Sequence, residues 1–127
     1  MYKRIVLKLS GEALAGDNPN VKFDNGIIKG IVNQIKEIME KGTQVSLVIG
    51  GGNFWRGRSA DHAMDRTKAD QIGMLATVMN ALALGDALSQ CGVANKVYSA
   101  VTVDKTLPCY IAGDAVKALQ EGKVVVF

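Results

Sequence analysis

The chain alternates β-type apolar runs with helical segments, and this order constrains its fold more than any other feature. Four short runs rich in β-branched and apolar side chains predict strands at residues 2–9, 45–49, 96–101 and 123–127. Between them, apolar side chains recur at helical spacing in residues 26–41, 70–90 and 114–120. Strands that alternate with helices favour a parallel sheet with right-handed crossovers. We therefore predict an α/β fold, a mainly parallel sheet sandwiched between helices.

The predicted helices differ in the breadth of their apolar surface. Residues 26–41 carry one apolar face, with Asp24 or Asn25 near the start and Gly42 just after the end. In residues 70–90 the apolar side chains cover more than one narrow stripe of the predicted helix surface. That breadth predicts burial on two sides, by the core and, in an oligomer, by a second subunit. Residues 2–9 are predicted to form a buried strand.

The composition favours a globular protein without a nucleic-acid or membrane partner. The chain has 127 residues, of which 48% are hydrophobic and 21% charged, with a net charge of +3. One domain and no strongly basic surface are therefore expected. We see no secretory leader and no apolar stretch near the roughly 20 residues that span a bilayer, which predicts a cytoplasmic protein. Cys91 and Cys109 lack a CxxC partner and are expected to be buried or half-buried thiols.

Two glycine-rich turns directly follow predicted strands. They are Lys8-Leu9-Ser10-Gly11 and Gly50-Gly51-Gly52-Asn53. Ligands of open α/β sheets bind outside the carboxyl ends of the strands, where glycine lets backbone N–H groups approach a phosphate. Three consecutive glycines lose much conformational entropy on ordering, so a simple turn would rarely use them. We interpret the two turns as one phosphate site built from two loops.

Polar residues near these turns have both a ligand interpretation and a structural one. Lys8 and Arg56 suit phosphate, to which a guanidinium binds in a bidentate way, but each also suits a solvated surface. Asp70 fits the N-terminal cap of the long helix, and Asn53 fits the cap of the segment after the turn. Neither GxxxxGK[ST] nor GxGxxG occurs, so the two best-known nucleotide fingerprints give no support.

Three segments in this order resemble bacterial uridylate kinases, a family within the amino-acid kinase superfamily. They are KLSGEAL at residues 8–14, IGGGN with Arg56 and Gly57 at residues 49–57, and Asp70 with GMLATVMNAL at residues 73–82. The first two motifs recur across the superfamily, and the third is more specific to uridylate kinases. The resemblance implies an amino-acid kinase-like fold, of which this chain is the N-terminal portion. It also implies phosphoryl transfer from ATP to UMP, giving UDP.

The resemblance implies roles for individual residues. Lys8 and Arg56 would be catalytic. The ATP-binding set would be Lys8, Leu9, Ser10, Gly11, Gly52 and Arg56, and the UMP-binding set would be Gly51, Arg56 and Asp70. Mg²⁺ would accompany ATP, with no metal ligand assigned in the chain. Family members form hexamers, are typically activated by GTP and are inhibited by UTP, so a homo-oligomer is expected.

The resemblance spans the whole chain but only about the N-terminal half of the family's protein. Residues 123–127 end inside a predicted strand, so we expect a domain truncated at its C-terminus with an unpaired strand edge. Because the family's second half carries a further nucleotide loop and the adenine pocket, we expect little or no turnover and self-association of the isolated chain. The alternative function is a non-catalytic nucleotide-binding or assembly fragment.

Other assignments are weaker. The segment 70–82 argues against a kinase that acts on a carboxylate or carbamate, and the missing GxGxxG argues against a dinucleotide-binding domain of the dehydrogenase kind. Gly85 stands where some family members carry an arginine of the GTP site, which weighs against GTP activation.

Overall fold

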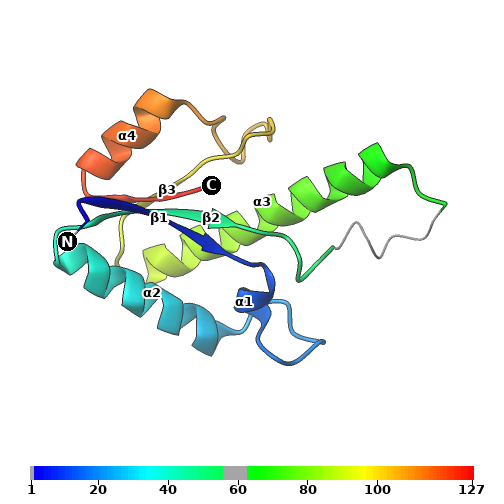
Figure 1. Ribbon diagram of the computed structural model, residues 1–127, viewed down its shortest axis with the longest axis horizontal. Coiled ribbons are helices and arrows are strands. Elements are labelled where there is room, and N and C mark those ends of the chain that lie inside the picture. The colour runs from blue at the N-terminus through cyan, green and yellow to red at the C-terminus, as the bar shows by residue number, and fades with distance from the viewer. Residues whose placement is uncertain (1, 56–62) are drawn as a thin grey trace.

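Strands and helices alternate along the chain in the computed structural model, which describes residues 2–55 and 63–127 (Figure 1). In chain order the elements are β1 (Arg4–Leu9), α1 (Glu12–Ala15), α2 (Asn25–Glu40), β2 (Gln44–Ile49), α3 (Arg66–Gln90), β3 (Asn95–Val97), α4 (Ala112–Gln120) and β4 (Val124–Val126). The strands pair in parallel in the order β1-β2-β4-β3. The predicted α/β fold is confirmed.

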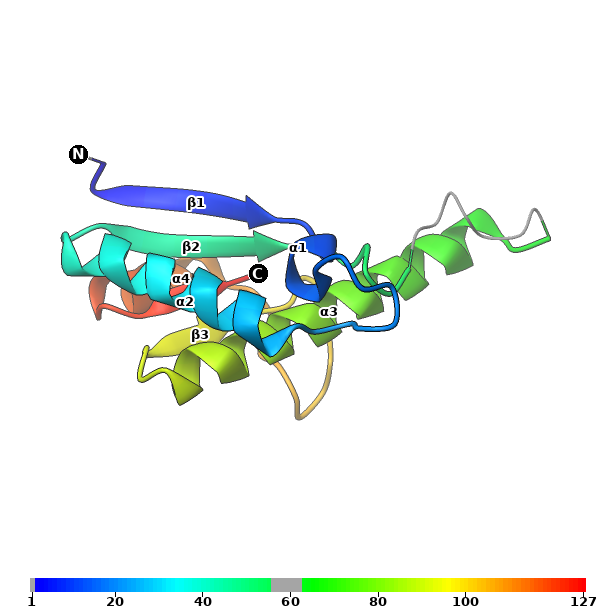
Figure 2. The ribbon, with the colours of Figure 1, turned by 90° about the horizontal axis from the view of Figure 1, so that it is seen from below.

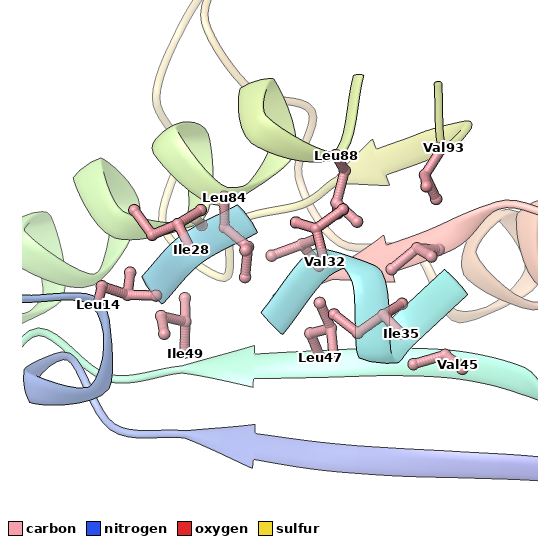
Figure 3. Packing of buried hydrophobic residues seen from close by; sticks show 13 residues of the cluster. Leu14, Ile28, Val32, Ile35, Val45, Leu47, Ile49, Leu84, Leu88 and Val93 are labelled. Atoms are coloured by element: carbon pink, nitrogen blue, oxygen red, sulfur yellow. The ribbon is translucent and has the colours of Figure 1, made fainter. Parts of the chain in front are cut away.

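Helices cover both faces of this sheet. Figure 1 shows α2 and α3 below the sheet and α4 above it. β4 serves both faces because successive side chains of a strand point in opposite directions. Val124 and Val126 join the larger core cluster with α2 and α3, whereas Val125 joins a smaller cluster with α4. Figure 3 shows the larger cluster, in which Val32 and Ile35 of α2 lie beside Leu47 of β2.

The helix α2 begins and ends where its sequence predicts. Asp24 is the N-cap, and its side chain accepts a hydrogen bond from the Ile27 N–H at 2.9 Å. Such a cap satisfies a backbone donor that the helix itself leaves unpaired. After the helix, Gly42 adopts a φ of +84°, the left-handed region in which glycine carries no Cβ penalty.

The long helix α3 begins earlier than predicted. Asp65, not Asp70, is its N-cap, and the Asp65 carboxylate accepts from the Lys68 N–H at 3.1 Å. The first turn is polar, so the apolar periodicity that predicted the helix becomes visible only from Ile72 onward. By length and hydropathy α3 is the one described helix able to cross a membrane, a test that core helices of soluble proteins also pass.

Two strands of the sheet take positions that differ from expectation. β1 is an edge strand rather than a buried one (Figure 2). Its Val6 side chain is 65% exposed. β4, predicted to leave an unpaired edge, lies between β2 and β3 and is fully buried. Apolar content identifies a strand but not its neighbours, because strand order is decided by the crossovers.

Local structure also departs from the predictions in three places. The short helix α1 was not predicted. The strand expected at residues 96–101 ends at Val97, because the chain then turns back and the Tyr110 N–H donates to the Ser99 carbonyl at 2.9 Å. Cys91 is partly buried as expected, but Cys109 lies in this returning segment and is exposed.

Candidate functional site

The two glycine-rich turns leave the sheet side by side. β1 and β2 run parallel and in register up to the pair Leu9 and Ile49, so both strands end at one edge of the sheet. The Gly50 N–H donates to the Leu9 carbonyl at 2.9 Å and ties the second turn to the end of the first strand. The structure thus brings together the two turns that the sequence predicts to form one site.

The turns pack more closely than side chains would permit. A Cβ on Gly11 would lie 2.6 Å from the Gly52 backbone nitrogen and 2.9 Å from the Gly50 carbonyl oxygen. A Cβ on Gly52 would lie 2.6 Å from a carboxylate oxygen of Glu12. The two loops therefore form one interlocked unit.

The second turn also lies on α3. A Cβ on Gly51 would come within 2.9 Å of both the Ala76 Cβ and the Thr77 nitrogen. Beyond the turn, the Trp55 Nε1–H donates to the Ala69 carbonyl at 2.9 Å. The segment 50–55 is thus seated along one face of the helix, where small residues allow close approach.

Backbone donors remain in this turn. Among the hydrogen bonds formed by the described residues, none uses the N–H of Gly51 or of Gly52. Neighbouring N–H groups that lack a protein partner are suited to bind an anion. The turn can therefore offer two donors to a phosphate.

Residues of the first turn have different surroundings. The Leu7 and Leu9 side chains pack against the larger core cluster, so Lys8 points to the opposite face, the same one as its register partner Val48. Lys8 is exposed. The Ser10 Oγ accepts a hydrogen bond from the Ala13 N–H at 3.3 Å and so helps to start α1. Of Leu9, only the backbone can face a ligand.

Asp70 is not a helix cap, and the expectation of that role is wrong. It lies one turn into α3, is exposed, and pairs with Arg66 at 3.1 Å. Asp70 directly follows Ala69, whose carbonyl accepts the hydrogen bond from Trp55. Asp70 therefore lies near the C-terminal end of the segment 50–55. Arg56 lies outside the described residues, and its predicted role stays a prediction.

A cavity of about 280 Å³ lies next to the second turn. Its walls come from the end of β2 (Val48 and Ile49), from α3 (Met74 and Thr77) and from the aromatic side chains of Tyr98 and Tyr110. Ile49 immediately precedes the turn, and Thr77 contacts it. Burial, followed by the Asp114 carboxylate, raises the pKa of Tyr98 above its usual value of 10.0, so Tyr98 is a neutral wall of this cavity at neutral pH.

Two polar residues that the sequence did not single out hold the turn in place. The buried Asn80 side chain of α3 donates to the Gly50 carbonyl at 2.6 Å. Lys22 lies on the other side, and its Nζ donates to the Asn53 carbonyl at 3.0 Å. The Asn53 side chain donates to the Lys22 carbonyl and to the Asn80 Oδ1. The segment that it was expected to cap runs into residues outside the described ones, so that role stays a prediction. The sequence signal that could have identified Asn80 is the presence of an asparagine within an otherwise apolar helical segment.

Within residues 2–55 and 63–127, no three His, Cys, Asp or Glu side chains are grouped closely enough to hold a metal ion. Gly85 packs against β3, where an added Cβ would lie 2.5 Å from the Val97 Cγ2. A larger residue at position 85 would therefore require β3 to move.

Residues 3–127 match the model of the amino acid kinase family. The chain belongs to the amino acid kinase family. It is 47% identical to the uridylate kinase of Mycoplasmopsis pulmonis (strain UAB CTIP) over 129 residues, which cover 100% of this chain and 53% of that protein. The predicted similarity to uridylate kinases is confirmed, and the chain spans about half the length of this curated relative.

Solved structures agree with this membership. The UMP kinase of Bacillus anthracis superimposes with a TM-score of 0.92 at 38% identity, covering 99% of this chain and 52% of that one. The UMP kinase of Ureaplasma parvum gives a TM-score of 0.90 at 39% identity, covering 100% and 56%. An isopentenyl phosphate kinase, at 17% identity and a TM-score of 0.66, shares the fold alone.

Proposed function

We propose that this chain carries the phosphate-binding loops of a UMP kinase, which transfers a phosphoryl group from ATP to UMP, gives UDP and serves pyrimidine nucleotide biosynthesis. The observation that carries the proposal is the interlocked pair of glycine turns at the ends of β1 and β2. The identity of 47% to a uridylate kinase across the whole chain favours UMP over the acceptors of other superfamily kinases.

The chemistry of such a transfer suits the residues present. The acceptor is a phosphate oxygen, largely ionised at neutral pH because the second pKa of a phosphate ester is about 6. No general base is then needed. Catalysis consists of aligning two phosphates and neutralising charge on the transferring oxygens. Removal of one well-placed donor in such a site typically raises the barrier by about 2.7–4 kcal/mol.

We assign roles to the residues on this basis. Lys8 would neutralise the ATP phosphates, with Leu9, Ser10, Gly11, Gly52 and Arg56 contributing to the same subsite. Gly51, Arg56 and Asp70 would hold UMP. The cavity beside Thr77 adjoins the Gly51 end of the turn. Its apolar walls could contact the part of a nucleotide that is attached to the phosphate.

Mg²⁺, when bound with ATP, would neutralise part of the negative charge of its phosphates. The described residues contain no carboxylate cluster to hold the ion by themselves. We therefore assign it to the nucleotide, as Mg²⁺–ATP. Lys8 and the Gly52 N–H would then contact the ATP phosphates, and the Gly51 N–H would contact the UMP phosphate.

A non-catalytic nucleotide-binding or assembly fragment is the second candidate. It is favoured by one observation, that the chain spans 53% of the curated relative. Under this alternative the turns bind phosphate but no transfer follows. A cytoplasmic location, a homo-oligomer such as the family's hexamer and UTP inhibition are properties of the proposed whole enzyme. Glycine at position 85, where some family members carry an arginine, weighs against GTP activation.

The test is calorimetric titration of the 127-residue chain with UMP and with Mg²⁺–ATP, with UDP formation measured on the same sample. We expect Asp70→Ala to weaken UMP binding and Lys8→Ala to weaken ATP binding, each by tenfold or more. Lys3→Ala, an exposed lysine at the opposite end of the first strand segment, is the matched control and should bind normally. Binding without UDP favours the fragment, UDP formation favours the kinase, and absence of binding to either nucleotide refutes both.

A further inference from the structure

We propose that Asn80 is a positioning residue, whose buried amide sets the orientation of the glycine-rich turn 50–53. The inference rests on the proposed function in taking this turn as the phosphate-binding element. It goes further by assigning control of the turn to a residue of α3 that need not touch a nucleotide.

The first observation is the burial of a polar side chain. Asn80 is 0% exposed, in the middle of a helix whose other buried residues are alanine, leucine and glycine. Burying an amide is unfavourable unless its hydrogen bonds are satisfied. A leucine would fill the same helix position without that requirement, so the amide is explained by its partners.

Every one of these partners belongs to the turn. The Asn80 Nδ2 donates to the Gly50 carbonyl at 2.6 Å and to the Asn53 Oδ1 at 2.7 Å. In return, the Asn53 Nδ2 donates to the Asn80 Oδ1 at 3.1 Å. The two amides thus close a ring of paired hydrogen bonds between the first and last residues of the turn and the helix.

Two carbonyl groups decide which way the amides face. The Gly50 carbonyl can only accept, so the Asn80 NH₂ group must point at it. The Asn53 NH₂ group likewise donates to the Lys22 carbonyl at 2.9 Å. Reversing either amide would place two acceptors against each other, so the ring has one stable orientation.

This orientation determines where the free donors of the turn point. In a trans peptide the carbonyl and the following N–H point in opposite directions. With the Gly50 carbonyl held against Asn80, the Gly51 N–H must point away from α3. Gly51 is also seated on the helix at Ala76 and Thr77, so the peptide cannot rotate freely. Asn80 therefore aims the Gly51 donor that we assign to phosphate.

Two isosteric variants test the proposal. Asn80→Asp places an oxygen against the Gly50 carbonyl and the Asn53 Oδ1, whereas Asn53→Asp retains the acceptor for Asn80 and loses only its own donor. We expect Asn80→Asp to weaken UMP binding by about tenfold or more, the factor that corresponds to loss of about 1.4 kcal/mol, and Asn53→Asp to weaken it less. Leu84→Ala, one helical turn further along α3 and fully buried, is the control that lowers stability and leaves affinity unchanged.

A nucleotide-independent readout separates this inference from the proposed function. In ¹⁵N-labelled chain, Asn80→Asp should shift the amide resonances of Gly51 and Gly52 and speed their exchange with solvent, and Leu84→Ala should not. Unchanged Gly51 and Gly52 resonances in folded Asn80→Asp overturn the inference. If Asn80→Asp does not fold, the same readout on Asn53→Asp decides it. If the unaltered chain binds no UMP, the proposed function fails, and the resonances alone decide whether Asn80 orients the turn.

Discussion

At the scale of single residues, Gly11 and Gly51 are required by space rather than by backbone conformation. The glycines with positive φ in the described chain are Gly16, Gly42, Gly92 and Gly122, none of which lies in the candidate site. Gly11 and Gly51 instead face backbone atoms at distances that no Cβ could share. Close approach between two loops and a helix is therefore the reason for glycine here.

Gly51→Ala tests this explanation. The added Cβ would lie 2.9 Å from the Thr77 nitrogen, part of a helix that cannot shift easily. We expect the free energy of unfolding to fall by about 1–3 kcal/mol, the usual cost of overpacking. Gly30→Ala is the control, because nothing lies within 4 Å of its Cβ and alanine favours a helix interior by up to about 1 kcal/mol. Equal effects of the two changes in urea denaturation would contradict the explanation.

Part of the candidate site was predictable residue by residue. Glycines directly after apolar strands indicated where the turns meet, because the ends of parallel strands share one edge of the sheet. The role of Asn80 was not predictable, since its partners lie 27 and 30 residues away and only the folded chain brings them together. Asp70 was mistaken for a cap because two aspartates precede the apolar part of the helix.

At the scale of elements, two acidic residues near the start of α3 have different roles. Asp65 caps the helix, whereas Asp70 forms an exposed ion pair with Arg66. Helix propensity and periodicity could not choose between these aspartates, because large apolar side chains recur in α3 only from Ile72 onward. The hydrogen bond that the Asp65 carboxylate accepts from the Lys68 N–H identifies Asp65 as the cap.

The variants Asp65→Ala and Asp70→Ala should therefore have opposite consequences. Loss of the cap at Asp65 is expected to lower the free energy of unfolding by about 1 kcal/mol. Asp70→Ala should change stability by less than about 0.5 kcal/mol, because an exposed ion pair contributes little, yet it should weaken UMP binding. Thermal unfolding and calorimetry on the two proteins check this. A larger loss of stability from Asp70→Ala would reverse the assignment.

Strand order was the least predictable part of the fold. Each strand was identified from its apolar run, but β1 lies at an edge and β4 in the centre. The apolar run from Val124 to Val126 is typical of any buried strand. The residues that flank it in the sequence do not indicate that β4 inserts between β2 and β3. Only the crossover through α4 determines that position.

At the scale of the whole molecule, apolar side chains remain exposed on α3. Met74, Leu75 and Met79 are 45%, 55% and 46% exposed. Exposed apolar side chains grouped in this way favour association. The broad apolar surface that the sequence predicted for this helix is thus present outside the core.

We expect the chain to self-associate through this surface. In sedimentation velocity the average mass should rise with protein concentration, and Leu75→Lys should shift it toward 13.5 kDa because the charge would be desolvated in an interface. Lys36→Leu, which removes an exposed charge on α2, is not expected to have this effect. A clean monomer at all concentrations would count against the prediction.

The central claim is that the two glycine turns together bind nucleotide phosphate. The most direct measurement is a titration of the ¹⁵N-labelled chain with UMP and then with Mg²⁺–ATP, followed by amide resonances. We predict that UMP moves Gly51 and neighbours of Asp70, and that ATP moves residues 8–11 and Gly52. Resonances that stay fixed in both turns, or that move only outside them, would contradict the account.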